Sequence, residues 1–270
     1  MDISGKSFYI SVDLEGCACT IGTPGQGLAA GTAGYEFACL QGTREANAAA
    51  EALFSLGAGE VWIWDSHGTG FNLRYDRLDS RCRIVLGAGS KKRFPGIDGS
   101  FGGVLFIGAH AHDASDATLC HVYSSASYQY QKINGAEVGE TEIDAAIAGK
   151  AGVPVLLVSS DDICVSQAKN SFPDAGTVVT KKALAWNSCI SLHPDKVCEM
   201  ISAEVKRVCA LPHPPKPFTI SEPFDYEVRF KRIEAAQSCS LRNPDNTPFS
   251  RPDAYTRCGR LARVEDIFEF

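Results

Sequence analysis

The 270-residue chain has no apolar run of the roughly 18 residues that a membrane-spanning helix needs. Its opening stretch, MDISGKSFYI, lacks a basic segment followed by an apolar one, so no secretory signal is predicted and a cytoplasmic location is expected. The formal net charge of −6 gives no basic surface for nucleic acid or anionic lipid. We therefore expect neither a nucleic-acid partner nor a membrane partner.

Several motifs of cofactor sites and nucleophiles are also missing. The 11 cysteines are odd in number and include no C-x-x-C pair, which favours reduced thiols over a disulfide framework. The glycine-rich stretches match neither the phosphate-loop nor the dinucleotide-binding pattern. No G-x-S-x-G occurs, so a serine hydrolase of that type is not indicated.

Apolar strand-like runs alternate with helical patterns along most of the chain. Strands are predicted at 7–14, 60–65, 102–110 and 153–162, and helices at 35–57, 141–152 and 194–211. The continuous apolar character of the later strands is typical of strands buried on both faces. The pattern predicts an α/β fold: a mostly parallel sheet with helices on both faces, plus a smaller α+β C-terminal part.

A proline-rich stretch at 211–218 suggests where the chain divides. Residues 1–211 are predicted to form a metal-binding α/β catalytic domain. Residues 218–270 are predicted to form a smaller C-terminal segment that takes part in oligomerisation or lines the substrate site.

Three of the predicted strands end in polar residues. The first ends in Asp13 and Glu15, which are two residues apart and so are expected on the same face of the strand. The second ends in DSHG at 65–68, and the third in AHAH at 109–112. Ligands of open α/β sheets bind outside the carboxyl ends of the strands, so these side chains are expected to meet at one edge. Carboxylates and imidazoles gathered there suit a divalent metal, and zinc in particular.

Five short motifs, in order, resemble those of the M55 family of zinc D-aminopeptidases. They are SVDLEG at 11–16, DSHG at 65–68, GAHA at 108–111, CHVYS at 120–124 and VGETEI at 138–143. The similarity runs from about residue 8 to residue 165 and fades beyond. Because the motifs occur together at compatible spacings, the resemblance is specific.

The resemblance implies a cofactor of two zinc ions per subunit. It implies that Asp13 bridges the two ions, that Glu15 and His67 complete one site, and that His110 and Glu140 complete the other. It further implies that His121 is the catalytic acid and base. We also expect Asp65 to orient His67, His112 to be an ordinary loop residue, and Asn134 to be a candidate contact for substrate.

The implied activity is that of a di-zinc metallo-aminopeptidase. It would hydrolyse N-terminal D-amino acids from short peptides such as D-Ala dipeptides, through a water molecule that bridges the metals. The family also implies a homo-oligomer, a ring-shaped decamer. Two alternatives stay open: a metal-dependent amidohydrolase or aminopeptidase with another small amide or an L-peptide as substrate, and a non-catalytic protein that binds peptide or metal.

Overall fold

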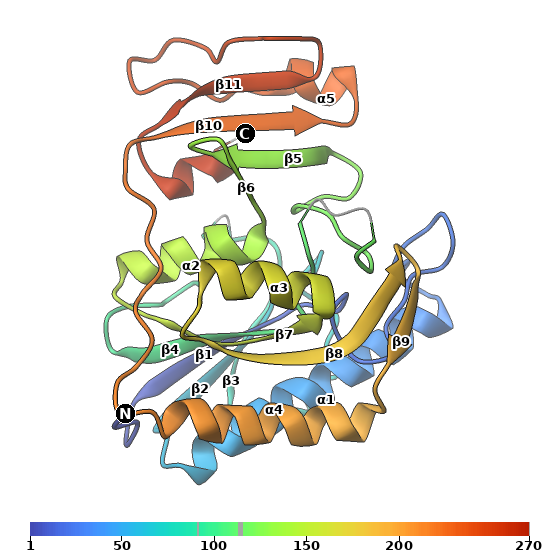
Figure 1. Ribbon diagram of the computed structural model, residues 1–270, viewed down its shortest axis with the longest axis vertical. Coiled ribbons are helices and arrows are strands. Elements are labelled where there is room, and N and C mark those ends of the chain that lie inside the picture. Colours follow the sequence, from blue (N-terminus) through green and yellow to red (C-terminus); the bar gives the residue numbers. More distant parts are fainter. Residues whose placement is uncertain (91, 113–115, 270) are drawn as a thin grey trace.

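The computed structural model describes residues 1–90, 92–112 and 116–269 and contains two sheets (Figure 1). The larger sheet has the strand order β3-β2-β1-β4-β7-β8-β9. All its neighbouring strands are parallel except the final pair, β8 and β9. The smaller sheet is antiparallel, with the order β11-β10-β5-β6.

The strands of the larger sheet are β1 (Ser7–Val12), β2 (Glu60–Asp65), β3 (Arg83–Val85), β4 (Phe101–Ile107), β7 (Val155–Asp161), β8 (Gly176–Ala185) and β9 (Ser188–Ser191). Those of the smaller sheet are β5 (Tyr128–Ile133), β6 (Ala136–Val138), β10 (Phe224–Phe230) and β11 (Thr256–Leu261). The α-helices are α1 (Ala33–Ser55), α2 (Glu140–Lys150), α3 (Asp162–Ser171), α4 (Pro194–Cys209) and α5 (Ile233–Ser238). Two short 3-10 helices are also present, η1 (Tyr75–Arg77) and η2 (Val264–Phe268).

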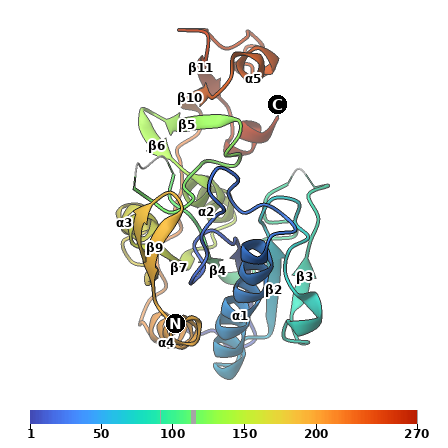
Figure 2. The same cartoon turned by 90° about the vertical axis from the view of Figure 1, so that its right-hand side faces the viewer.

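Helices cover both faces of the larger sheet, as the alternation of patterns predicts. Helices α1 and α4 pack side by side on one face, and α2 and α3 lie on the other (Figures 1 and 2). Side chains alternate between the faces with a period of two: Phe8 and Ile10 of β1 join the core under α1, whereas Tyr9 joins the core under α2. The predicted fold class is confirmed.

Helix α1 has clear start and stop signals in the sequence. The Thr32 side chain accepts a hydrogen bond from the amide of Tyr35, 3.2 Å away, as an N-cap does. Gly57 follows the C-terminus in the left-handed region, with φ of +95°. The predicted helix over 35–57 is therefore displaced from the observed one by only two residues at each end.

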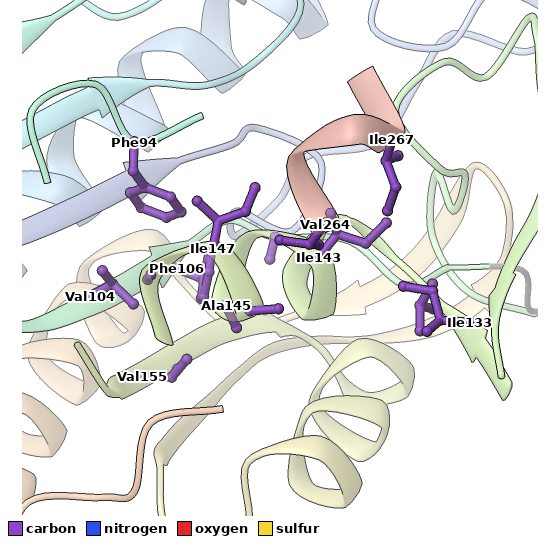
Figure 3. Close-up of a cluster of buried hydrophobic side chains, with 14 of the residues drawn as sticks. Phe94, Val104, Phe106, Ile133, Ile143, Ala145, Ile147, Val155, Val264 and Ile267 are labelled. Atoms are coloured by element: carbon purple, nitrogen blue, oxygen red, sulfur yellow. The ribbon is translucent and has the colours of Figure 1, made fainter. Parts of the chain in front are cut away.

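The C-terminal segment shares its sheet and its core with earlier parts of the chain. Its strand β10 pairs with β5, which comes from within residues 1–211. Figure 3 shows Ile143 of α2 beside Val264 of η2, and Ile267 and Ile133 belong to the same buried cluster. The stretch 211–223 joins the two parts without helix or strand. The domain boundary at 211–218 stays a prediction, but the smaller sheet is built from both sides of it.

The helices in the described part of the chain include none that is long and apolar enough to cross a lipid bilayer.

Candidate metal centre

The candidate centre lies at the end of β1, the strand from which the larger sheet extends in both directions. Strand β1 has β2 on one side and β4 on the other, and the three are parallel. Their carboxyl ends therefore share one edge, and a crevice forms between loops that leave in opposite directions. A cavity of about 390 Å³ opens there; its lining includes Asp13, Glu15, His67, His121 and Glu140.

The turn after β1 sets the orientation of the first two carboxylates. Strand β1 ends at Val12, so Asp13 and Glu15 lie in the turn rather than on one face of the strand. The amide of Leu14 donates to Asp13 Oδ1 at 2.9 Å and to Glu15 Oε2 at 3.3 Å. One backbone N–H thus holds both carboxylates on the same side.

Two glycines allow this turn to touch the loop that follows β4. The amide of Gly16 donates to the carbonyl of Gly108 at 2.7 Å. A Cβ atom on Gly16 would lie 1.9 Å from the carbonyl oxygen of Ala109, and one on Gly108 would lie 2.2 Å from that of Asp13. Gly108 also has φ of +69°, which L side chains rarely adopt. Only glycine at both positions permits this approach, which brings His110 next to Asp13.

A buried lysine from β8 fixes the same turn from the other side. The ammonium of Lys181, 1% exposed, donates to the carbonyls of Glu15, Cys17 and Thr20, the last two at 3.1 Å and 2.6 Å. Burial lowers the pKa of this ammonium. Its donors are nonetheless all directed at carbonyl oxygens of the turn that carries Glu15.

The first group of candidate ligands consists of Asp13, Glu15 and His67. His67 follows β2, and its Nδ1 lies 2.8 Å from Asp13 Oδ1 and 3.0 Å from Glu15 Oε2. Burial disfavours the imidazolium, but the negative charges of Glu15 and Asp13 outweigh it and raise the pKa of His67 well above its usual value. Two carboxylates and an imidazole nitrogen therefore converge on one point.

The second group consists of His110, His121 and Glu140. Glu140 is the first residue of α2, and its Oε1 lies 3.0 Å from His110 Nε2 and 4.0 Å from His121 Nε2. The two imidazole rings stack with centroids 3.9 Å apart. The amide of Tyr123 donates to the same Glu140 oxygen at 2.7 Å, which fixes the carboxylate.

Backbone carbonyls select the tautomer of both histidines in this group. Nδ1 of His110 lies 3.2 Å from the carbonyl oxygen of Ala111, and Nδ1 of His121 lies 2.8 Å from that of Leu119. A neutral ring that donates from Nδ1 keeps its lone pair at Nε2. Both Nε2 atoms face Glu140, as a metal ligand or a proton acceptor requires.

The residues present fit a pair of divalent cations. In each group the candidate ligand atoms lie within 4.8 Å of one another. Asp13 faces both groups, because its Oδ1 approaches His67 and its Oδ2 lies 3.4 Å from His110 Nε2. Carboxylate oxygen and neutral imidazole nitrogen form a donor set typical of zinc. The structure thus brings all five predicted ligands together, and their assignment as ligands stays a prediction.

Distance alone groups His121 with His110 and Glu140, although the sequence resemblance gives it a different role. Burial, followed by the charge of His110, lowers the pKa of His121. A neutral imidazole suits either a ligand or a general base. Removal of the His121 side chain would lower the zinc content if His121 is a ligand, and would leave it unchanged if His121 is a general base.

One of the other predicted contacts is wrong. Asp65 does not orient the His67 ring: its carboxylate accepts hydrogen bonds from Asn72, Leu73 and Tyr75, and the Asn72 side chain in turn donates to the carbonyl of His67 at 2.6 Å. Asp65 therefore shapes the loop instead. Asn134 lies in the turn between β5 and β6, where it bonds both backbone groups of Asp225, and it is not among the residues that line the cavity; its contact with substrate stays a prediction. His112 belongs to neither ligand group, as expected.

Sequence reasoning missed Arg93, a basic residue beside the carboxylates. Its guanidinium binds Asp144 of α2 at 2.8 Å and 2.6 Å and lies over the ring of Trp64 at 4.4 Å. It also lines the cavity of about 390 Å³ described above, which we call the metal cavity. Neither Arg93 nor Lys181 follows a strand that carries a ligand motif, so no local signal could have revealed them.

Comparison with known proteins gives three consistent findings. Residues 7–247 match the model of peptidase family M55, described as D-aminopeptidase. A D-aminopeptidase of Bacillus subtilis (strain 168) is 31% identical over 198 residues, which cover 72% of this chain and 70% of that one. The solved structure of the Zn-dependent D-aminopeptidase DppA from Bacillus subtilis, described as a self-compartmentalizing protease, superposes with a TM-score of 0.88 at 24% identity, covering 97% of this chain and 94% of that one.

Proposed function

The chain belongs to peptidase family M55, the D-aminopeptidases, and we propose that it is a two-zinc aminopeptidase that removes N-terminal D-amino acids from short peptides such as D-Ala dipeptides. The observation that carries the proposal is the pair of ligand groups that meet at Asp13. Its two carboxylate oxygens face different imidazoles, which is the arrangement a bridging ligand needs.

Each residue has a proposed part in holding the metals. Asp13 would bridge the two ions, Glu15 and His67 would complete one site, and His110 and Glu140 would complete the other. When bound, zinc supplies a Lewis acid for the scissile carbonyl and lowers the pKa of a water molecule toward neutrality. Hydrogen bonds fix the carboxylate ligands in place: the amides of Leu14 and Tyr123 donate to their carboxylates, and the Lys181 ammonium donates to the carbonyl of Glu15.

The proposed role of His121 is to move one proton. With Nδ1 bonded to the carbonyl of Leu119, its Nε2 can accept a proton from the attacking water and return it to the leaving nitrogen. Its ring is held in place by stacking on His110. A base fixed in one tautomer and one orientation needs little rearrangement before the transfer.

Removal of the metal tests the proposal. Incubation with a chelator is expected to abolish release of D-alanine from D-Ala–D-Ala, because no described side chain in the cavity replaces a Lewis acid. Zinc added back should restore the activity. The measurement is the amount of free D-alanine over time, with L-Ala–L-Ala as a matched substrate. Activity that persists without metal would refute the mechanism, and preference for the L-dipeptide would refute the D-specific claim.

We also propose that the protein assembles as a homo-oligomer, a ring-shaped decamer. The relative DppA is described as self-compartmentalizing. In this chain the β8–β9 hairpin exposes Leu184 and Ile190, and the residue after it, Leu192, is also exposed; a subunit contact could cover these three large apolar side chains. A native mass equal to that of one chain would contradict the assembly.

A further inference from the structure

A second cavity, of about 330 Å³, adjoins the metal cavity. The two share four lining residues, Ser66, Gly68, Arg93 and Tyr123. None of the residues of the two ligand groups lines this second cavity. A substrate held at the metals could therefore extend into this second cavity.

Aromatic side chains from distant parts of the chain contribute to the walls of the second cavity. Trp64 lies in β2, Tyr128 begins β5, and Phe268 belongs to η2 near the C-terminus. The rings of Tyr123 and Phe268 meet edge to face at 5.1 Å. The C-terminal segment thus closes one side of the cavity, and apolar groups of a substrate would be well packed there.

One polar side chain in this wall has no partner. Gln131 of β5 lines the cavity and is 1% exposed, yet neither its Nε2 nor its Oε1 makes a hydrogen bond within the described part of the chain. A buried amide without partners is costly, because both of its polar atoms lose their bonds to water. The cost is offset if a ligand supplies one donor and one acceptor.

A peptide group has that combination, since it carries one N–H and one C=O. In an aminopeptidase substrate the first peptide group is the bond that is cleaved, and it must lie at the metals. The next peptide group, between the second and third residues, is the first one free to reach another cavity. Gln131 is therefore matched to the part of the substrate that leaves after cleavage.

We propose that the cavity lined by Gln131 is a subsite for the leaving segment of the peptide, in which the Gln131 amide bonds the peptide group between the second and third residues. The proposal rests on the aminopeptidase function proposed above. It makes Gln131 a determinant of substrate length: the N–H of the third residue of a tripeptide would donate to Gln131 Oε1, whereas a dipeptide ends there in a carboxylate that has no N–H to donate.

The test compares D-Ala–L-Ala with D-Ala–L-Ala–L-Ala on the wild-type protein and on Gln131→Leu. Wild type is expected to have the higher kcat/KM on the tripeptide. Gln131→Leu should lower kcat/KM on the tripeptide roughly five- to tenfold, the worth of one or two neutral hydrogen bonds, and leave the dipeptide within about twofold. Its melting temperature should not fall, because leucine removes an amide that has no partner in the free protein.

Gln129→Leu is the matched control. It makes the same change on the same strand, but Gln129 is exposed, and its Oε1 accepts a hydrogen bond from Arg229 at 2.8 Å. It should leave the ratio of the two substrates unchanged. Equal loss on both peptides in Gln131→Leu, or no loss on the tripeptide, would overturn the subsite.

A binding measurement separates this proposal from the function on which it rests. If wild type cleaves neither peptide, the aminopeptidase function fails, and calorimetry with the product L-Ala–L-Ala then judges the subsite alone. Binding weakened roughly five- to tenfold in Gln131→Leu supports the subsite. Equal binding by both proteins overturns it.

Discussion

Replacement of His121 by alanine is expected to lower kcat for D-Ala–D-Ala by roughly 10²- to 10⁴-fold, the usual contribution of a positioned general acid and base. The side chain is proposed to move the proton between water and the leaving nitrogen, so its loss removes that transfer. Zinc content should stay the same as in wild type, because the five proposed ligands remain. Turnover and metal analysis on one preparation measure both effects.

His213→Ala is a suitable control for this variant. His213 is exposed in the stretch that joins the two sheets and takes no part in either ligand group. It should leave both turnover and zinc content unchanged. Normal turnover in His121→Ala would show that the proposed role is wrong, and loss of one zinc ion would place His121 among the ligands.

Lys181→Met is expected to lower the free energy of unfolding by about 3 kcal/mol and to weaken zinc binding. Methionine nearly fills the space of the lysine side chain but cannot donate to the carbonyls of Glu15, Cys17 and Thr20. The turn that carries Glu15 would then keep only the hydrogen bond from Thr180 to the carbonyl of Gly16 as a side-chain anchor to β8 among the described contacts. Chemical denaturation and zinc titration measure the two effects.

Lys182→Met makes the identical substitution at the next position of β8, where the side chain is exposed. Its stability should stay within about 0.5 kcal/mol of wild type, as for most surface changes. If Lys181→Met is as stable as Lys182→Met and binds zinc equally well, the anchoring role of Lys181 is wrong.

The sequence predicts those parts of the fold that rest on local pattern. Strand β1, strand β2 and helix α1 have buried runs, helical spacing and caps that decide their structure locally. The ligand motifs follow from the same reasoning, because parallel strands must end at a common edge. For this reason the amino-acid sequence alone predicts that Asp13, His67 and His110 lie close together.

What the sequence does not predict depends on contacts between distant segments. Strands β5 and β6 form a hairpin around Asn134 and Gly135, a dipeptide that favours such turns, but the pairing of β5 with β10 has no local signal. The same holds for Lys181, which lies 166 positions from Glu15. Gln131 is recognisable only once its burial and its missing partners are known.

The domain prediction shows the same limit. The proline-rich stretch at 211–218 lies within a segment, Leu211 to Pro223, that has no helix or strand. Composition could not show that the segment beyond it completes a sheet begun by β5. Nor could it show that η2 closes a cavity beside the metal centre.

The most direct test of the account is the number of zinc ions bound per chain, measured by native mass spectrometry of the purified protein. Two ions per chain are expected in wild type, since two ligand groups meet at Asp13. Asp13→Ala should lose both, because each site shares that carboxylate. A wild-type protein that binds no zinc when it is supplied would contradict the proposed metal centre and the mechanism built on it.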